Sequence, residues 1–288
     1  MILVGVDGSQ AALEAVSWAV REAGLRDTGL RVVHVMVAWP LEMTEDAPYA
    51  DVGRWMRDGA TSVLTDALNR AREEDSRVRV ESSLLPGDPR GVLIKAAQDA
   101  DLLVVGSHGR DGFSGMLLGS VALGVAGHTT CPVAVVRRTP ARPGGEVVVG
   151  VDGSVAGASA IEFAFAEASL RGAGLRAVHA WNQPVAGGGP FALASAEEAA
   201  EGERRLLAEA LAGWGERYPD VKVTEQMEHG HPVDVLKNAS AQADLLVVGS
   251  RGRGGLAGLL LGSVSHSLLQ HAVCPLVVTP AVTAPRHT

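Results

Sequence analysis

The chain has 288 residues, a length typical of two domains, and 47% of its residues are hydrophobic, enough for each half to bury a core. Its formal net charge of −8 argues against a nucleic-acid partner. Two cysteines without a CxxC pair argue against a disulfide framework or a metal site and fit a reducing compartment. No signal-peptide pattern and no membrane-length apolar run occur, so we expect a cytoplasmic protein that does not bind membranes.

In the first half, strands that alternate with helices are predicted from the spacing of apolar residues. A helix is expected between Ser9, a candidate N-cap, and Gly24. A second helix should begin with Asp88 as N-cap and Pro89 in its first turn. The strands are predicted over 2–6, 30–38, 77–84, 102–105 and 133–136. The remaining helices are predicted over 54–74 and 120–128, after a loop over 39–53.

A linker predicted over 137–145 is followed by the same order of elements. Strands are expected over 147–151, 175–181, 221–227 and 275–278, a loop over 184–194, a long helix over 196–216 and another helix from His231-Pro232. We therefore predict two α/β domains, residues 1–139 and 146–280, each with a mostly parallel sheet covered on both faces, and then a disordered tail.

Each half also contains a buried strand that leads into a glycine-rich loop and a helix. Residues 101–120 read DLLVVGSHGRDGFSGMLLGS, and residues 244–263 repeat the Gly-x2-Gly-x9-Gly-Ser spacing. Such glycines let the backbone approach a ligand, and a helix N-terminus attracts anions. The pattern therefore predicts two nucleotide sites. It is neither a Walker A loop, since the lysine is missing, nor a GxGxxG fingerprint after the first strand.

A GVDGS turn follows the first strand of each half, at 5–9 and 150–154. The carboxylates of Asp7 and Asp152 in these turns could accept hydrogen bonds from ribose or adenine, or reach Mg²⁺ through water. They could instead form Asx turns or cap the following helices. If the first and fourth strands are neighbours, each turn faces a glycine loop across one crevice.

The loop charges differ between the halves. His108 and Arg251 occupy one position, and either could donate to phosphate. Arg110 and Arg253 follow on the same loops and could do the same or be solvated loop charges. No Ser/His/Asp set or acid pair occupies matching positions in both halves, so the sequence favours binding over catalysis. His34 and His179 within the second strands are interpreted as core or strand-end histidines.

Several short segments resemble the tandem form of the universal stress protein family. They are the two VGVDGS turns, the HV and HA strand ends, the repeated glycine pattern, and the CPV and CPL segments. The glycine pattern resembles the ATP-binding branch. The resemblance implies two Rossmann-like domains, each a five-stranded parallel sheet of order 3-2-1-4-5 with helices on both faces. It also implies ATP, with Mg²⁺, in each crevice, and pairing through the last strands as a homodimer or pseudo-two-fold monomer.

The residues expected to contact nucleotide are carried over by motif. In the first half they are Val6, Asp7, Gly8, Val35, Val105, Gly106, His108, Gly109, Arg110, Gly119, Ser120 and Val121. In the second half they are Val151, Asp152, Gly153, Ala180, Val248, Gly249, Arg251, Gly252, Arg253, Gly262, Ser263 and Val264. Ala180 in place of Val35 should loosen the adenine wall.

Three functions remain open. The first is a cytoplasmic stress-response protein that binds ATP in each domain as a regulatory ligand, with an unidentified protein partner. The second is a slow ATP hydrolase or phosphotransferase, for which His108 is the candidate acid or base. The third is an assembly module whose nucleotide sites are not essential.

Overall fold

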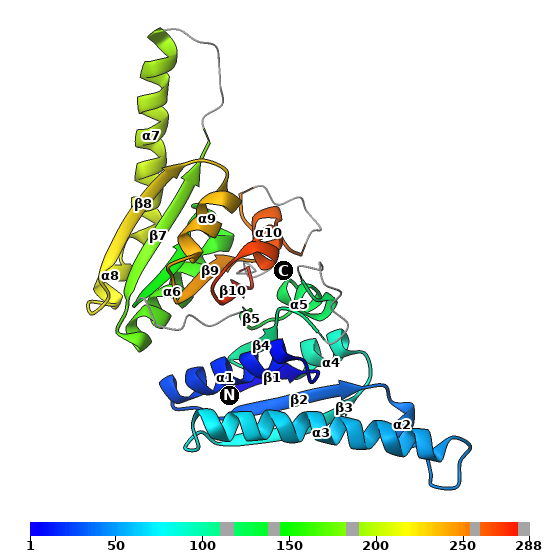
Figure 1. Ribbon diagram of the computed structural model, residues 1–288. Helices are drawn as coiled ribbons and strands as arrows, with labels where there is room; N and C mark the ends of the chain where they lie inside the picture. Colours follow the sequence, from blue (N-terminus) through cyan, green and yellow to red (C-terminus); the bar gives the residue numbers. More distant parts are fainter. Residues whose placement is uncertain (110–117, 138–144, 183–189, 254–259, 282–288) are drawn as a thin grey trace, which may run out of the picture. The chain divides into compact units, whose positions relative to one another are not determined.

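The computed structural model of the chain describes residues 1–109, 118–137, 145–182, 190–253 and 260–281. The chain divides into two compact units, Met1–Thr139 and Pro140–Thr288, called domain 1 and domain 2 below. Each contains five of the strands and its own helices (Figure 1). Among the helices within the described ranges, none is both long and apolar enough to cross a membrane.

Domain 1 is built on a parallel sheet. Its strands are β1 (Ile2–Val6), β2 (Leu30–Met36), β3 (Val80–Pro86), β4 (Leu102–Gly106) and β5 (Val133–Val136). Its helices are α1 (Gln10–Leu25), α2 (Trp39–Glu42), α3 (Ala50–Glu74), α4 (Pro89–Ala96) and α5 (Ser120–Ala126). The sheet order β3-β2-β1-β4-β5 confirms the predicted 3-2-1-4-5 arrangement. Helix α1 packs with α3, and α4 packs with α5.

Domain 2 repeats this arrangement. Its strands are β6 (Glu146–Gly150), β7 (Gly174–Trp181), β8 (Val223–His229), β9 (Leu245–Gly249) and β10 (Leu276–Thr279). Its helices are the short 3₁₀ turn η1 (Val155–Gly157), α6 (Ala158–Arg171), α7 (Pro190–Leu211), α8 (Trp214–Arg217), α9 (Pro232–Ser240) and α10 (Ser263–His271). The sheet is again parallel, in the order β8-β7-β6-β9-β10.

The central strands are buried because helices cover both of their faces. Leu102 and Leu103 in β4 and their counterparts Leu245 and Leu246 in β9 are fully buried. Such continuous apolar runs are typical of parallel sheets. In each sheet the strand order reverses between the first and fourth strands of the domain, and ligands of doubly wound folds bind beyond the carboxyl ends of strands at this switch point.

The predicted helix starts are confirmed. The Ser9 hydroxyl accepts from the backbone N–H of Ala12 at 3.1 Å at the start of α1. The Asp88 carboxylate accepts from the N–H of Gly91 at 3.0 Å, and Pro89 stands in the first turn of α4. These caps satisfy backbone donors that a helix N-terminus otherwise leaves unpaired.

The predicted single helix over 196–216 is wrong. Helix α7 begins at Pro190, within the predicted loop over 184–194, and ends at Leu211, and α8 follows from Trp214. The break lies at Gly213, whose φ of 80° is left-handed and ends a helix. The turn lets Trp214 stack on Phe165 of α6, with ring centroids 5.7 Å apart, so the break serves aromatic packing.

The loop predicted over 39–53 also contains helix. The short α2 occupies residues 39–42 with Pro40 in its first turn, and α3 begins at residue 50 rather than 54. The third strand begins at Val80, not residue 77, because Arg77 donates its backbone N–H to the Asp75 carboxylate at 2.9 Å in a preceding turn. The predicted linker lies largely, and the predicted tail almost entirely, outside the described residues.

Candidate functional site

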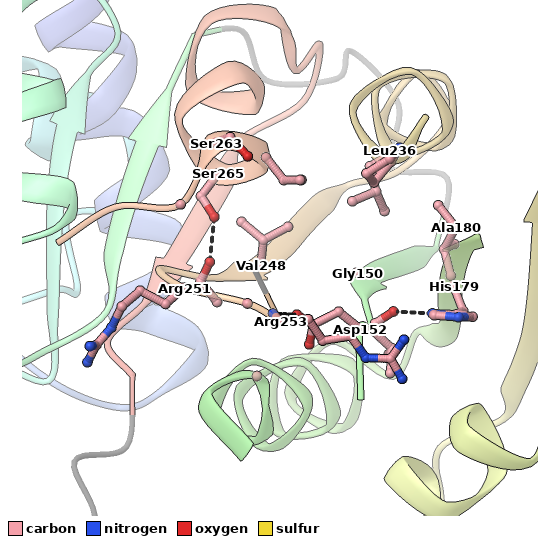
Figure 2. A pocket seen from close by; sticks show the side chains of 18 of the residues that line it. Gly150, Asp152, His179, Ala180, Leu236, Val248, Arg251, Arg253, Ser263 and Ser265 are labelled. Carbon is pink, nitrogen blue, oxygen red and sulfur yellow. Dashed lines mark hydrogen bonds between the residues drawn. The ribbon is translucent and has the colours of Figure 1, made fainter. Parts of the chain in front are cut away.

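A pocket of about 370 Å³ opens at the carboxyl ends of β6 and β9, within domain 2 (Figure 2). Its volume falls in the range of small-molecule sites. The structure brings most of the second-half prediction to this one pocket: Val151, Asp152, Ala180, Val248, Gly249, Arg251, Gly252, Arg253, Gly262, Ser263 and Val264. Gly153 does not line it; with φ of 71°, it forms the turn beneath α7.

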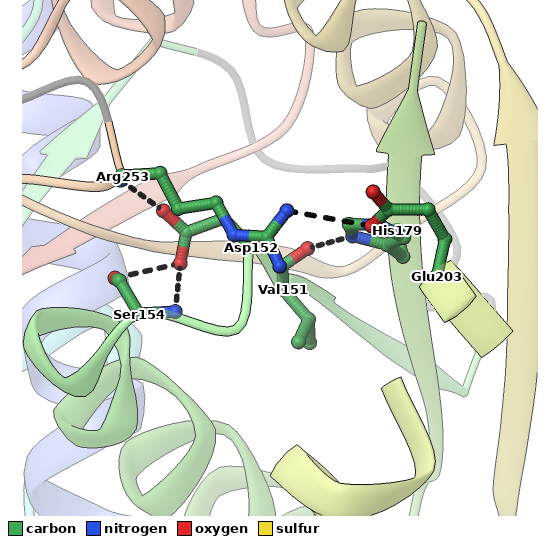
Figure 3. A network of polar contacts seen from close by, with 6 residues as sticks. All are labelled: Val151, Asp152, Ser154, His179, Glu203 and Arg253. Atoms are coloured by element: carbon green, nitrogen blue, oxygen red, sulfur yellow. Dashed lines mark hydrogen bonds and ion pairs between the residues drawn. The ribbon is translucent and has the colours of Figure 1, made fainter. Parts of the chain in front are cut away.

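Asp152 joins the two loops that form the floor of the pocket. One carboxylate oxygen accepts from the backbone N–H of Ser154 at 2.9 Å and from its hydroxyl at 2.7 Å. The other oxygen accepts from the backbone N–H of Arg253 at 2.8 Å (Figure 3). The turn after β6 is thereby tied to the glycine loop after β9. The bond between Asp152 and the backbone N–H of Ser154 forms the predicted Asx turn. The bond between Asp152 and the backbone N–H of Arg253 is an additional contact that joins the two loops.

Close packing explains the Gly-x2-Gly spacing. A Cβ at Gly252 would collide with the Asp152 carboxylate, and one at Gly109 would lie 2.7 Å from the Asp7 carboxylate. A Cβ at Gly106 would lie 2.7 Å from the backbone carbonyl carbon of Ala11. These glycines are therefore required by the fold of the site itself, whatever ligand it binds.

The N-terminus of α10 forms another wall of the pocket. The helix begins at Ser263 with Gly262 as its N-cap, and the N–H of Gly262 donates to the Ser250 carbonyl at 2.7 Å. The Ser265 hydroxyl donates to the Gly249 carbonyl at 2.6 Å, which fixes the helix against the end of β9. Ser263 is exposed. The first N–H groups of the helix, with its positive dipole end, make this wall suitable for an anion.

The opposite wall is apolar. Figure 2 shows Leu236 of α9 and Ala180 of β7 on the side of the pocket away from Ser263. Val151 and Val248, at the ends of β6 and β9, complete an apolar surface. One pocket thus combines an apolar wall with an anion-favouring helix N-terminus. Leu236 was missed from the sequence because it lies on a helix far from both motifs.

The two arginines of the loop differ in direction. In Figure 2 Arg251 extends away from Asp152 and His179, whereas Arg253 turns toward them. The Arg253 guanidinium lies 3.4 Å from a carboxylate oxygen of Glu203 on α7, which the sequence did not suggest. Arg251 is exposed, as expected for a loop charge.

His179 and Glu203 extend this polar network (Figure 3). The ring Nδ1 of His179 lies 2.7 Å from the Val151 carbonyl oxygen, and Nε2 lies 2.7 Å from the same Glu203 oxygen that faces Arg253. Partial burial raises the pKa of Glu203, but the hydrogen bond with His179 and the charge of Arg253 outweigh this effect, so the pKa lies below its ordinary value.

Domain 1 places its predicted residues in matching positions. Asp7 accepts from the Ser9 N–H at 3.0 Å, and the Ser9 hydroxyl donates to the His108 carbonyl at 3.3 Å, so turn and loop are again joined. The His108 ring bonds the Ser107 hydroxyl at 2.7 Å. Val6, Val35, Val105 and Gly106 lie at the carboxyl ends of β1, β2 and β4, Gly8 in the turn, and Gly119, Ser120 and Val121 at the start of α5. Arg110 lies outside the described residues.

Within the described ranges, no three His, Cys, Asp or Glu side chains gather closely enough to hold a metal ion. Cys131 and Cys274 are buried and have free thiols. Burial raises the pKa of Cys131 to about 11 and that of Cys274 to about 12, so neither is a nucleophile at neutral pH.

Two sets of five parallel strands, each with a glycine loop where its strand order reverses, define a tandem doubly wound α/β protein. The model of the universal stress protein family matches residues 1–137 and 145–280, and the chain belongs to this family. Universal stress protein Rv2623 of Mycobacterium tuberculosis is 39% identical to this chain over 285 residues. The match covers 96% of this chain and 95% of the relative's chain.

A solved structure shares the fold. A universal stress protein from Archaeoglobus fulgidus matches with a TM-score of 0.67 at 23% identity, over 97% of this chain and 96% of its own. Another universal stress protein from this organism, solved in complex with dAMP, is 25% identical and covers 47% of this chain and 96% of its own, with a TM-score of 0.36.

Proposed function

We propose that this chain is a cytoplasmic stress-response protein that binds ATP in each of its two domains as a regulatory ligand. One observation carries the proposal: the domain 2 pocket combines an apolar wall, a close-packed glycine loop and a helix N-terminus. An adenine ring requires an apolar surface, and phosphates require backbone donors in a positive field. The pocket offers both.

The residues of the pocket fit this ligand. Adenine would lie against Val151, Ala180 and Leu236, and the phosphates against the glycine loop and Ser263. Phosphate binding here requires no lysine, because backbone N–H groups supply the hydrogen-bond donors and the helix dipole supplies a positive field. Since the described residues form no metal cluster, Mg²⁺ would be held mainly by the phosphates, as this ion commonly is.

The same role is proposed for domain 1, where Asp7, Gly109, Gly119 and Ser120 stand at matching positions. His108 replaces Arg251, so the two sites should differ in phosphate affinity. Whether the protein is a homodimer or a pseudo-two-fold monomer stays a prediction, for which sedimentation equilibrium is the direct measurement.

A regulatory role is favoured over catalysis because the groups that the two sites share are glycines, serines and an aspartate engaged in loop bonds. Release of phosphate from ATP well above background, and lost in His108→Ala, would instead support the hydrolase or phosphotransferase alternative. Unchanged behaviour of Gly109→Ala and Gly119→Ala would support an assembly module with non-essential sites.

Calorimetric titration of nucleotide-stripped protein with ATP tests the proposal, and we expect up to two sites. Ser263→Asp is the sharpest variant, because a carboxylate at a helix N-terminus favours the helix but repels phosphate. Ser263→Asn is the neutral control of matching shape, and Ser120→Asp is the counterpart in domain 1. We expect each Asp variant to lose one site. No ATP binding by the wild type, or full binding by both Asp variants, would contradict the proposal.

A further inference from the structure

The guanidinium of Arg253 lies on the wall of the domain 2 pocket, but a carboxylate of the protein already pairs with it. Arg253 lines the pocket, and its Nη1 lies 3.4 Å from Oε2 of Glu203. Figure 3 shows the Arg253 side chain extending past Asp152 to reach this contact. A neighbouring carboxylate cancels much of the field that a guanidinium exerts on an anion. The pair therefore affects how strongly the pocket attracts a ligand phosphate.

Glu203 itself is held in place from two directions. The same carboxylate oxygen lies 2.7 Å from Nε2 of His179, a residue that is 3% exposed. One turn further along α7, the Leu206 side chain packs so closely on the turn after β6 that a Cβ at Gly153 would collide with it. The helix and the carboxylate are therefore anchored, and Arg253 faces a negative group that has little freedom to turn away.

The Arg253 side chain, in contrast, can turn without moving the loop. Its backbone N–H donates to the Asp152 carboxylate at 2.8 Å, and this bond does not involve the guanidinium. The side chain is 45% exposed, and an arginine has several rotatable bonds between its backbone and its charge. The guanidinium can therefore leave Glu203 for a phosphate in the pocket. Arg251 extends away from this network in Figure 2, so Glu203 constrains one of the two loop cations.

Domain 1 has a different residue at the position that matches Glu203. Strands β3 and β8 begin at Val80 and Val223, and counting twenty residues back from each strand leads to Ala60 and Glu203. Both residues lie on the long helix that precedes the strand, α3 in domain 1 and α7 in domain 2. Ala60 is buried. The two domains thus share the glycine pattern but differ at this helix position, where domain 2 alone has a carboxylate.

We propose that Glu203 is a specificity-determining residue of the domain 2 pocket. By pairing with Arg253 it withholds this cation from the ligand, and so weakens the preference of the pocket for nucleotides with more phosphates. The inference rests on the proposed function for its ligand. Carboxylate and phosphate bind a guanidinium in the same bidentate manner, so a ligand phosphate must compete with Glu203 for Arg253. When the charge of Glu203 is removed, Arg253 should turn to the ligand.

The expected effect grows with the charge of the ligand. ATP carries more negative charge than AMP, and adenosine carries none. For one charge at the distance of a pocket wall, and an effective dielectric constant between those of protein and water, removal of the Glu203 charge should raise ATP affinity about three- to tenfold. On the same reasoning AMP should gain about two- to threefold and adenosine nothing. A change in pocket shape would instead affect all three ligands alike.

Calorimetric titrations with these three ligands test the proposal. All variants carry Ser120→Asp, which is expected to remove the domain 1 site and leave the domain 2 site to be measured. Glu203→Gln removes the charge, keeps the shape and can still hydrogen-bond with His179. Glu201→Gln, which should leave all three affinities unchanged, is the matched control, because Glu201 lies on the same helix and pairs with Arg204 at the surface at 2.7 Å. Partly exposed ion pairs contribute little to stability, so we expect each variant to fold like the wild type.

Arg253→Gln shows whether the effect of Glu203 passes through Arg253. This substitution keeps the backbone bond to Asp152. In the Arg253→Gln background, the gain from Glu203→Gln should shrink to about twofold or less, which is the effect of removing a charge that does not itself line the pocket. A double-mutant cycle measures this non-additivity. An equal gain with and without the Arg253 side chain, or equal changes for ATP and adenosine, would overturn the inference.

Inorganic tripolyphosphate separates failure of this inference from failure of the proposed function. ATP binding that is unchanged by Glu203→Gln would overturn the inference and leave the proposed function intact. If the protein bound no ATP, but its affinity for tripolyphosphate rose with Glu203→Gln, the proposed function would be wrong and the role of Glu203 in anion binding would be supported. No binding of ATP or tripolyphosphate by any variant would overturn both.

Discussion

Gly252→Ala should separate the glycine loop of domain 2 from Asp152. The added methyl would collide with a carboxylate oxygen of Asp152. The carboxylate cannot easily withdraw, because the N–H and hydroxyl of Ser154 hold its other oxygen at 2.9 and 2.7 Å. The loop must therefore move, and the 2.8 Å bond from the Arg253 N–H to Asp152 is lost.

The magnitude follows from that bond. A hydrogen bond to a charged group contributes about 1.5–3 kcal/mol. Replacing glycine by alanine also raises the free energy of unfolding by about 0.4–1 kcal/mol, because it reduces the conformational freedom of the unfolded chain. We expect a net loss of about 1–2 kcal/mol in the free energy of unfolding. A displaced loop should also weaken ATP binding at this site about tenfold, since tenfold corresponds to about 1.4 kcal/mol.

Urea unfolding and ATP titration of the same preparation measure both effects. Gly202→Ala on α7 is the matched control, because Gly202 is exposed and a Cβ there meets no atom within 4 Å. That variant should be more stable by about 0.5–1 kcal/mol, as expected for glycine to alanine within a helix. If Gly252→Ala matched the wild type in stability and in ATP affinity, the contact between the loop and Asp152 would have no energetic role.

Further expectations concern other parts of the chain. Gly153→Ala should lower the unfolding midpoint, because a φ of 71° costs other residues about 1–2 kcal/mol and the methyl would also crowd α7; unchanged urea unfolding would contradict this. Asp88→Ala should cost about 1 kcal/mol by removing the cap bond to Gly91, measured in the same way, with Asp88→Asn largely preserving stability. Cys131 and Cys274, with pKa values raised to about 11 and about 12, should react slowly with a thiol reagent at neutral pH, and faster only in urea or as the pH approaches those values; rapid reaction of the native protein would contradict their burial.

Features encoded by neighbouring residues were predictable from the sequence. The helix starts at Ser9 and Asp88 follow from a single capping side chain and the apolar spacing after it. The internal repeat also made the site predictable, because a glycine pattern that occurs at the same spacing in both halves can be distinguished from the glycines of ordinary turns. The strand order followed from the family resemblance and agrees with the pairing of β1 with both β2 and β4.

Features that depend on contacts between distant residues were not predictable. Glu203 lies on a long helix rich in glutamates, and nothing in the sequence distinguishes it from Glu201, which pairs with Arg204 at the surface. The break at Gly213 depends on the stacking of Trp214 on Phe165, about 50 residues earlier. Gly213 is itself a local stop signal, because glycine is a poor helix former and commonly ends a helix, so this part of the break could have been predicted.

The bonds of Asp152 also limit what this carboxylate can offer a ligand. A carboxylate has about four acceptor positions. Three are already used by donors of the protein, two from Ser154 and one from Arg253. One position remains, which suits a single hydroxyl or amino group. A ligand that demands more from Asp152 must first displace a donor that holds the loops together, and its association should then be slower than diffusion allows.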